Sequence, residues 1–261
     1  MSKPLLIVLW AFKFSRFDWK RFELSLLEKK HEADIRIHTM MEILYPDVSE
    51  IQYDTYEDER IINYNSFKKW KTDLKRLIKE RNSKILIINN VPNHNFFGFL
   101  VNLELKKSKL NVLNFASLTH PDPYKYEFNK DMSFYLQKIS IAITNPRNLK
   151  YYLKSKIFSA IASLFNLLPT HVLKIGSKAF PDHYYNKNVQ IIEGSSHDYS
   201  LYLDSKINNP RFIKDEYALF LEAPTPLFPG DHAITGLNHK KFYTIEKWFP
   251  SLNRFFKNLE D

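Results

Sequence analysis

Short apolar runs alternate with longer amphipathic stretches along most of the chain. The apolar runs have the length of buried strands, and the stretches between them repeat their apolar residues at the spacing of a helix. The runs predict strands at residues 4–11, 33–38, 84–91, 111–115, 171–175 and 189–192. The stretches predict helices at residues 17–30, 66–81, 95–107 and 146–168. This succession predicts an α/β fold, with a Rossmann-like, doubly wound and mostly parallel sheet.

Individual residues predict where several of these elements begin. Ser15 is expected to cap the first helix, because a serine hydroxyl accepts hydrogen bonds from the amides of a first helical turn. Pro146 suits the first turn of the fourth helix, where a missing amide proton has no partner to lose. Residues 45–64 are acidic and follow no regular period, which predicts a surface loop or an excursion from the fold.

The stretch from residue 215 to residue 256 reads as a strand, a proline-rich loop and a helix. Residues 217–221 form a short, continuous apolar run, typical of a strand that is covered on both faces. Apolar residues recur at helical spacing from Ile245 onward. Because Pro250 is tolerated only in a first turn, the regular helix is predicted to begin near residues 247–250.

Ionisable side chains follow the predicted strand at 217–221. Open α/β sheets bind ligands beyond the carboxyl ends of their strands. A general base must be a carboxylate or a histidine close to the hydroxyl that it activates. The candidate catalytic residues are therefore Glu222, Asp231 and His232. The alternative is a structural connection that is packed by its prolines.

Polar loops and histidines also follow other predicted strands, and they supply candidates for substrate binding. These candidates are Ser196, His197, Asp198, Tyr199, His94 and His120. Asp198 can accept a hydrogen bond from a substrate hydroxyl, or it can cap a turn. Tyr199 can stack on a ring of the ligand, or it can pack in the core. His120 lies in a loop where it can meet a phosphate.

Composition narrows the classes of partner. The net charge is +9 and the sequence pI is about 9.3, which suits a phosphate-bearing substrate or an anionic membrane surface. No nucleic acid is expected, because the lysines are spread along the chain and no zinc-finger or RNA-binding signature is present. With no cysteine and no histidine pair at ligand spacing, neither a metal nor a cofactor is expected. The 5 glycines form no phosphate-binding motif.

The predicted helix at 146–168 has two interpretations. Lys150, Lys154 and Lys156 precede an apolar half, and basic residues beside an apolar face can lie on an anionic bilayer. The alternative is a helix that packs on the sheet. The apolar run at residues 4–11 is too short to span a bilayer, which takes about 20 residues. Without a cleavage site after it, the chain is expected to be cytoplasmic, or peripheral to the inner face of the membrane.

Two segments carry a resemblance to a known family. The sequence FLEAPTPLFPGDHAITG, at 220–236, is followed by KWFPSLNRFF at 247–256, and SSHDYSLYL lies upstream at 195–203. These segments resemble a family of bacterial surface-polysaccharide (capsule or O-antigen) biosynthesis proteins that are glycosyltransferase-like. The likeness is good over about residues 190–260. The family is expected to have two Rossmann-like halves in a GT-B-like architecture.

The resemblance implies an organisation and a function. Residues 1–240 would form the N-terminal, acceptor-side Rossmann-like domain, and residues 241–261 a helix leading toward a second domain that this chain does not include. The whole protein would transfer a sugar from a nucleotide-sugar donor to a glycan or lipid-linked acceptor, without a metal because no D-x-D motif is present. This chain alone would then be inactive. The alternative function is a non-catalytic module of the same pathway that binds a membrane or a partner.

Overall fold

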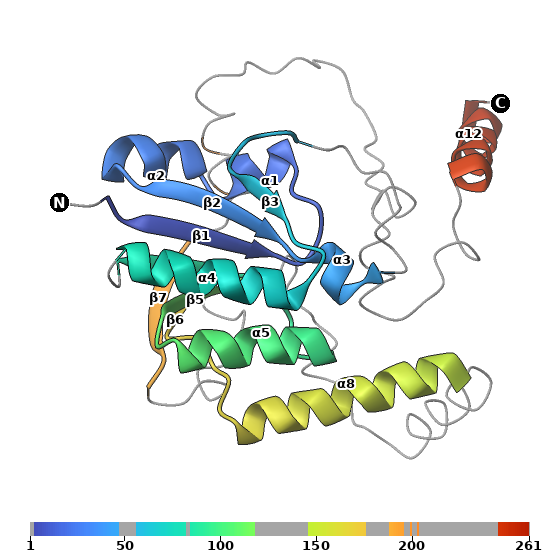
Figure 1. The fold of residues 1–261 in the computed structure, drawn as a ribbon. Helices are drawn as coiled ribbons and strands as arrows, with labels where there is room; N and C mark the ends of the chain where they lie inside the picture. The colour runs from blue at the N-terminus through green and yellow to red at the C-terminus, as the bar shows by residue number, and fades with distance from the viewer. Residues whose placement is uncertain are drawn as a thin grey trace.

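A single sheet of parallel strands forms the centre of the computed structural model (Figure 1). The structure describes residues 3–46, 56–81, 84–117, 146–175, 188–195 and 245–260, together with Tyr199 and Leu203. The strands are β1 (Leu5–Trp10), β2 (Asp34–Thr39), β3 (Ile61–Asn63), β4 (Ile85–Asn89), β5 (Asn111–Ser117), β6 (His171–Ile175) and β7 (Gln190–Gly194). All six strand pairings are parallel, in the order β3-β2-β1-β4-β5-β6-β7. The predicted Rossmann-like α/β fold is therefore confirmed.

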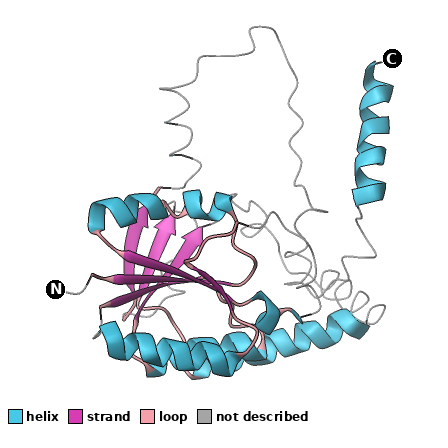
Figure 2. Ribbon diagram, turned by 45° about the horizontal axis from the view of Figure 1, so that its top comes forward, coloured by secondary structure: helices cyan, strands magenta, loops and turns pink. Residues whose placement is uncertain are grey.

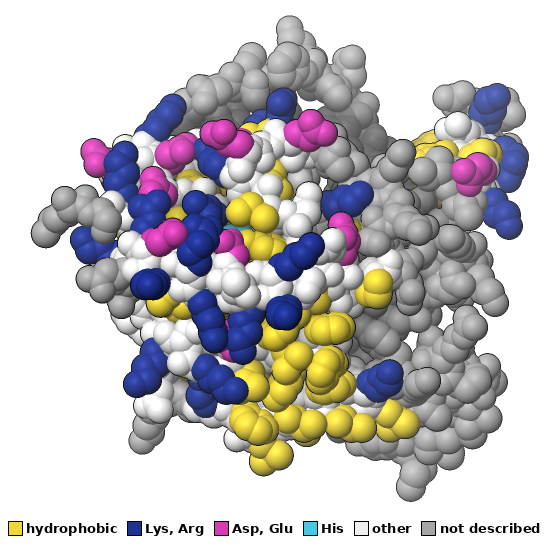
Figure 3. Space-filling model, viewed as in Figure 1, with side chains coloured by type: hydrophobic (Ala, Val, Ile, Leu, Met, Phe, Trp, Pro, Cys, Tyr) yellow, Lys and Arg dark blue, Asp and Glu magenta, His cyan; other side chains and the backbone are white. Residues whose placement is uncertain are grey.

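Helices cover both faces of this sheet (Figure 2). The described helices are α1 (Arg16–Arg21), α2 (Leu24–His31), α3 (Met41–Leu44), α4 (Phe67–Arg81), α5 (Phe96–Lys107), α8 (Pro146–Leu164) and α12 (Ile245–Glu260). Helices α1 and α2 lie on one face, and α4 and α5 lie on the other. Helix α8 runs along α5, and an apolar surface extends over these two helices (Figure 3). No described helix is long and apolar enough to cross a membrane.

Strand β1 is buried along its whole length because it contacts helices on both faces. Alternate residues of a strand point to opposite faces. Leu5, Ile7 and Leu9 belong to the core under α4 and α5, which includes the fully buried Trp70. Leu6, Val8 and Trp10 belong to the core under α1 and α2.

The strand order reverses between β1 and β4. The chain builds β1, β2 and β3 in one direction, and then α4 returns it to the other side of β1. At such a switch point the loops that follow the two central strands diverge, and ligands of open α/β sheets bind there, at the carboxyl edge. Because every described strand is parallel, all of their carboxyl ends lie at this one edge.

The local predictions hold for most elements. Ser15 caps α1 in a reciprocal capping box with Asp18, and Pro146 begins α8. The single helix predicted at 17–30 is two helices, because Glu23 adopts a left-handed backbone conformation with φ 50° between α1 and α2. The loop predicted at 45–64 is wrong at its end, where residues 61–63 form the edge strand β3. The strand predicted at 217–221 lies outside the described residues.

The predicted start of the C-terminal helix is also wrong. Helix α12 begins at Ile245, so Pro250 lies in its second turn rather than in its first. A proline there removes the amide that would donate to the carbonyl of Glu246. The hydroxyl of Ser251 donates to the carbonyl of Lys247 at 2.7 Å, which satisfies a neighbouring acceptor. The strongly amphipathic pattern after Pro250 carries the helix through the proline.

Gly98 allows α5 to pack closely against the loop that follows β4. A Cβ atom at this position would lie 2.0 Å from the carbonyl oxygen of Pro92, which is backbone and cannot rotate away. The amide of Gly98 donates to the side chain of Asn95, the N-cap residue, at 2.7 Å. Asn102, one turn further along, donates to the carbonyls of Val91 and Gly98. The first turns of α5 are thus fixed to the carboxyl edge of the sheet.

His38 is a fully buried histidine on the face of β2 that lies under α4. Its ring contacts Tyr64 edge to face, with 5.0 Å between the ring centres. Within the described residues neither ring nitrogen has a hydrogen-bond partner. Burial lowers the pKa of His38 to about 3, although the nearby carboxylate of Asp73 acts in the opposite direction. The fold therefore holds this imidazole neutral.

Replacing Gly98 with alanine tests the close packing of α5. Gly→Ala inside a helix ordinarily stabilises by about 0.5–1 kcal/mol. We expect G98A instead to lower the free energy of unfolding by about 1–3 kcal/mol in urea denaturation, because the added methyl group forces the backbone of Pro92 to move. G194A is the matched control, since its nearest neighbour is a terminal methyl of Leu173 that can rotate. A stabilised G98A would contradict this packing.

Replacing His38 with phenylalanine tests the neutral imidazole. The unfolded chain takes up a proton at His38 between about pH 6.5 and pH 3, and the folded chain does not, so stability falls as the pH falls through this window. Relative to wild type, H38F should gain about 2 kcal/mol of unfolding free energy between pH 7 and pH 5. H31F, at an exposed histidine, is the control for replacing a histidine with phenylalanine as such. Equal pH dependence in H38F and wild type would mean that His38 is protonated in the folded chain.

Candidate functional site

A cavity of about 420 Å³ opens at the carboxyl edge of β1, β2 and β3. It is the edge at which open α/β sheets bind their ligands. The cavity is lined by Lys13, Phe14, Thr39, Met41, Glu42, Tyr56, Glu57, Asp58, Ile61, Asn63 and Tyr64. These residues come from the loop after β1, the end of β2, the short helix α3, and the segment that leads into and out of β3. We call this space the carboxyl-edge cavity.

Parallel pairing brings distant polar groups together on the wall of this cavity. Thr39 and Asn63 are register partners at the ends of β2 and β3. The Thr39 hydroxyl donates to the side-chain oxygen of Asn63 at 2.5 Å. This bond holds the amide group of Asn63 in one orientation. The strand pairing thereby fixes a hydroxyl and an amide at the rim.

An ion-pair cluster fixes the segment before β3 over α1 and α2. Arg60 donates to both oxygens of Asp58, at 2.7 Å from Nε and 2.6 Å from Nη2, and to Glu28 at 2.9 Å. Its guanidinium also lies over the ring of Trp19, 4.0 Å from the ring centre. The hydrogen bonds from Arg60 lower the pKa of Asp58 to about 2. Asp58 is therefore a fixed, ionised part of the wall.

Two other carboxylates of the cavity are available to a ligand. Glu42 and Glu57 are exposed, and neither forms an ion pair within the part of the chain that the structure describes. Carboxylates accept hydrogen bonds from hydroxyl groups, and the half-buried ring of Tyr56 lines the same cavity. Acceptors beside a tyrosine ring suit a ligand that is rich in hydroxyl groups. Lys13 lines the same cavity, but the two carboxylates outnumber it and disfavour an anionic ligand.

The start of α1 provides no cradle for a diphosphate. In dinucleotide-binding Rossmann proteins the diphosphate lies at the N-terminus of the first helix, after a glycine-rich turn. Here the loop after β1 contains no glycine, and the Asp18 carboxylate accepts from the amide and hydroxyl of Ser15 at 2.9 and 2.6 Å. Asp18 is buried, and burial raises its pKa. The carboxylate of Asp18 thus lies at the start of α1, where dinucleotide-binding proteins hold the diphosphate.

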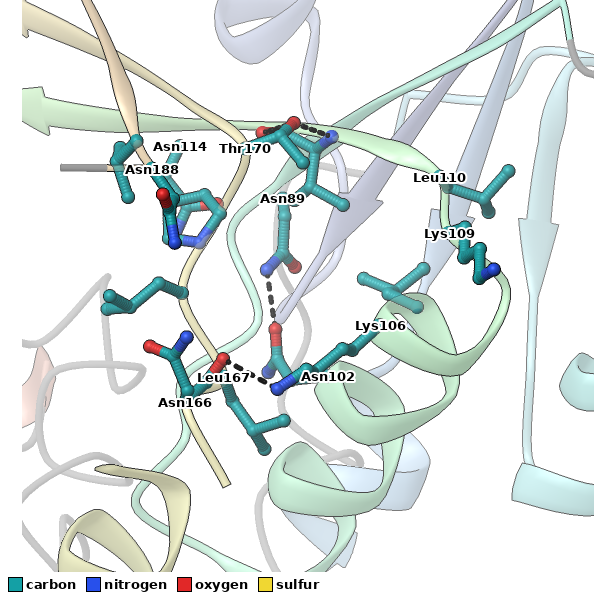
Figure 4. A pocket seen from close by; sticks show the side chains of 15 residues that line it. Asn89, Asn102, Lys106, Lys109, Leu110, Asn114, Asn166, Leu167, Thr170 and Asn188 are labelled. Atoms are coloured by element: carbon teal, nitrogen blue, oxygen red, sulfur yellow. Dashed lines mark hydrogen bonds between the residues drawn. The ribbon is translucent and has the colours of Figure 1, made fainter. Parts of the chain in front are cut away.

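A second cavity, of about 310 Å³, lies between α5, the end of α8 and the amino ends of β5, β6 and β7 (Figure 4). Most of its polar side chains form hydrogen bonds that connect one helix or strand to another. Asn89 donates to Asn102 at 2.8 Å, which links β4 to α5. Lys106 donates to the carbonyl of Asn166 at 3.2 Å, and Thr170 bonds to both backbone groups of Val112. These contacts attach the end of α8 to the sheet, so we interpret this cavity as structural.

Several of the sequence-predicted residues for substrate and membrane contacts lie among the described residues. His94 lies in the loop between β4 and α5, at the carboxyl edge, with Nε2 3.4 Å from the hydroxyl of Tyr45. Burial lowers the pKa of His94. Lys154 and Lys156 are exposed on α8, and Lys150 lies in its first turns.

Tyr199 is exposed and follows β7, at the opposite end of the sheet from β3. The structure therefore does not bring it to the carboxyl-edge cavity. The predicted polar loops after β6 and β7 do begin at one shared edge, because these two strands are parallel neighbours. The remaining candidates lie outside the described residues. They are Glu222, Asp231, His232, Ser196, His197, Asp198 and His120.

The sequence interpretation missed the carboxyl-edge cavity. It assigned residues 45–64 to a surface loop, although Tyr56, Glu57 and Asp58 form one wall of the cavity. The available signal was the short apolar pair Ile61-Ile62 after an acidic segment, which is compatible with a short strand. Among the described residues, no group of three or more histidine, aspartate or glutamate side chains is placed to hold a metal ion.

Comparisons with known proteins found no significant match. No family model matches the chain, and no curated protein or solved structure is significantly similar to it. The resemblance to glycosyltransferase-like polysaccharide proteins thus rests on the sequence segments between residues 195 and 256, most of which lie outside the described residues.

Proposed function

We propose that this chain is the acceptor-side half of a nucleotide-sugar-dependent, glycosyltransferase-like protein of bacterial surface-polysaccharide biosynthesis. The observation that carries the proposal is the carboxyl-edge cavity, whose walls combine carboxylates, an oriented amide and the half-buried ring of Tyr56. Such walls suit the hydroxyl groups and apolar faces of a sugar. The cavity lies on a Rossmann-like sheet, the fold expected for each half of the family.

The first βα turn favours an acceptor-side role over a donor-side role. A donor half must hold a nucleotide diphosphate, and Rossmann-like proteins do this with backbone amides at a helix N-terminus. In this chain Ser15 and Asp18 already satisfy each other at that place. The neighbouring Glu42 and Glu57 add negative charge. A neutral glycan avoids this repulsion, and a diphosphate does not.

The catalytic candidates of the proposal remain Glu222, Asp231 and His232. Each can act as a general base toward an acceptor hydroxyl, provided that it lies within hydrogen-bond reach of that hydroxyl. The carboxyl-edge cavity would supply binding and orientation of the acceptor, rather than proton transfer.

Ligand-observed NMR on the 261-residue chain tests the proposal. A panel of neutral hexoses, N-acetylhexosamines and short oligosaccharides should give binding signals, and UDP should give none. The double variant E42Q/E57Q should weaken the binding of the best sugar about tenfold or more, because a hydrogen bond to a charged group contributes about 1.5–3 kcal/mol. E59Q is the matched control, since Glu59 is exposed on the same segment but does not line the cavity.

Three results would contradict the acceptor-side assignment. One is binding of UDP at the carboxyl-edge cavity, detected as displacement of the bound sugar. Another is an affinity for sugar that is equal in E42Q/E57Q and wild type. The third is turnover of a nucleotide-sugar by this chain alone at the rates of an enzyme.

A further inference from the structure

The apolar residues of helix α8 cover a wide arc of its surface, and only part of this arc packs on α5. Its inner side packs on α5, where Phe158 and Phe165 contact Phe99 with ring centres 6.3 and 5.8 Å apart. Its outer side carries Leu153, Ile157 and Leu164, which are 51 %, 56 % and 85 % exposed. At about 100° per residue these three side chains lie within about 40° of one another on the helix. The apolar arc of α8 is therefore wider than the part that its contact with α5 covers.

The N-terminus of α5 extends this exposed apolar face. Phe96 and Phe97 are 51 % and 40 % exposed, and the ring of Phe96 lies 6.0 Å from that of Phe158. Figure 3 shows apolar side chains gathered over α5 and α8, with basic side chains beside them. We call this face the α5–α8 apolar surface, defined by Phe96, Phe97, Leu153, Ile157, Leu164 and Phe165. Contiguous exposed apolar surfaces of this kind mark sites of interaction.

Among the described residues, the exposed charged side chains beside this surface are lysines. Helix α8 contains four cationic residues and no aspartate or glutamate. Lys154 and Lys156 are exposed next to the apolar stripe of α8. Helix α5 ends in Lys106 and Lys107, and its acidic residue, Glu104, is buried and pairs with Lys71 at 2.7 Å. The partner of this face must therefore offer apolar material together with negative charge.

We propose that the α5–α8 apolar surface docks on an anionic lipid bilayer. The apolar side chains would enter the boundary between headgroups and acyl chains, and the long lysine side chains would reach the anionic headgroups. A second copy of the chain fits less well, because a symmetric contact would bring the lysines of both copies together. A bilayer supplies apolar material and negative charge in one surface.

If the α5–α8 apolar surface docks on a bilayer, the carboxyl edge of the sheet lies near the lipid, which bears on the proposed function. The docking itself does not depend on the proposed function. Phe96 begins α5 immediately after the loop that leaves the carboxyl end of β4. Docking through Phe96 and Phe97 would hold the carboxyl edge of the sheet close to the bilayer. A lipid-linked acceptor could then reach that edge without leaving the membrane.

Co-sedimentation of the 261-residue chain with vesicles tests docking. Wild type should sediment with vesicles of phosphatidylcholine and phosphatidylglycerol, and at least tenfold less with phosphatidylcholine alone. L153S/I157S/L164S and K154E/K156E should each bind the anionic vesicles at least tenfold more weakly. F17S/L26S and K20E/K29E are matched controls, because these residues are similarly exposed on α1 and α2 and should leave binding unchanged.

A fluorescent probe identifies the face that touches lipid. The chain has no cysteine, so I157C and L26C each give one labelling site for an environment-sensitive dye. The dye at position 157 should shift to the blue when anionic vesicles are added, and the dye at position 26 should not.

Several outcomes would overturn the proposal. Wild type that does not bind anionic vesicles would do so, and so would L153S/I157S/L164S that binds as wild type does. A dye at position 157 that is already blue-shifted without lipid would show that another part of the protein covers this face. Self-association of wild type that L153S/I157S/L164S abolishes, with no change in vesicle binding, would make the face an interface between copies.

Discussion

Burial of β1 on both of its faces is the constraint on which the rest of the structure depends. An uncharged, continuously apolar strand is stable only when helices cover it from both sides. Residues 5–10 satisfy this requirement with two separate cores, one under α4 and α5 and one under α1 and α2. Because β1 pairs with both β2 and β4, it also sets the point at which the strand order reverses. The carboxyl-edge cavity lies to one side of this point, where β1, β2 and β3 end.

The carboxyl edge of the sheet has two regions that differ in their polar groups, the start of α1 and the ends of β2 and β3. At the start of α1 the chain satisfies its own helix amides with Ser15 and Asp18, which leaves no preformed site for a diphosphate there. Beside it, pairing of β2 with β3 sets Thr39 against Asn63 and places Glu42 and Glu57 nearby. The edge is thus organised around hydrogen-bond acceptors. This chemistry is the basis of the proposal that the edge binds an uncharged ligand with many hydroxyl groups.

Sequence reasoning succeeded where a pattern is local and failed where partners are distant. The period of apolar residues predicted α4, α5 and β6 nearly to the residue, because these elements each bury a complete face. It missed β3, whose three residues show no period and are held by pairing with β2. The carboxyl-edge cavity joins Thr39 to Asn63, which are 24 residues apart, and only strand register reveals that contact. Strand order and the uncovered side of α8 likewise depend on tertiary packing.

Hydrogen exchange on the 261-residue chain, with and without a bound neutral oligosaccharide, tests the central claim most directly. The account predicts that the sugar slows amide exchange in residues 39–44 and 56–64, which form the carboxyl-edge cavity, and leaves residues 106–112 and 165–171 unchanged. Protection at residues 106–112 and 165–171 would contradict it, because the ligand would then occupy the second cavity, at the opposite edge of the sheet.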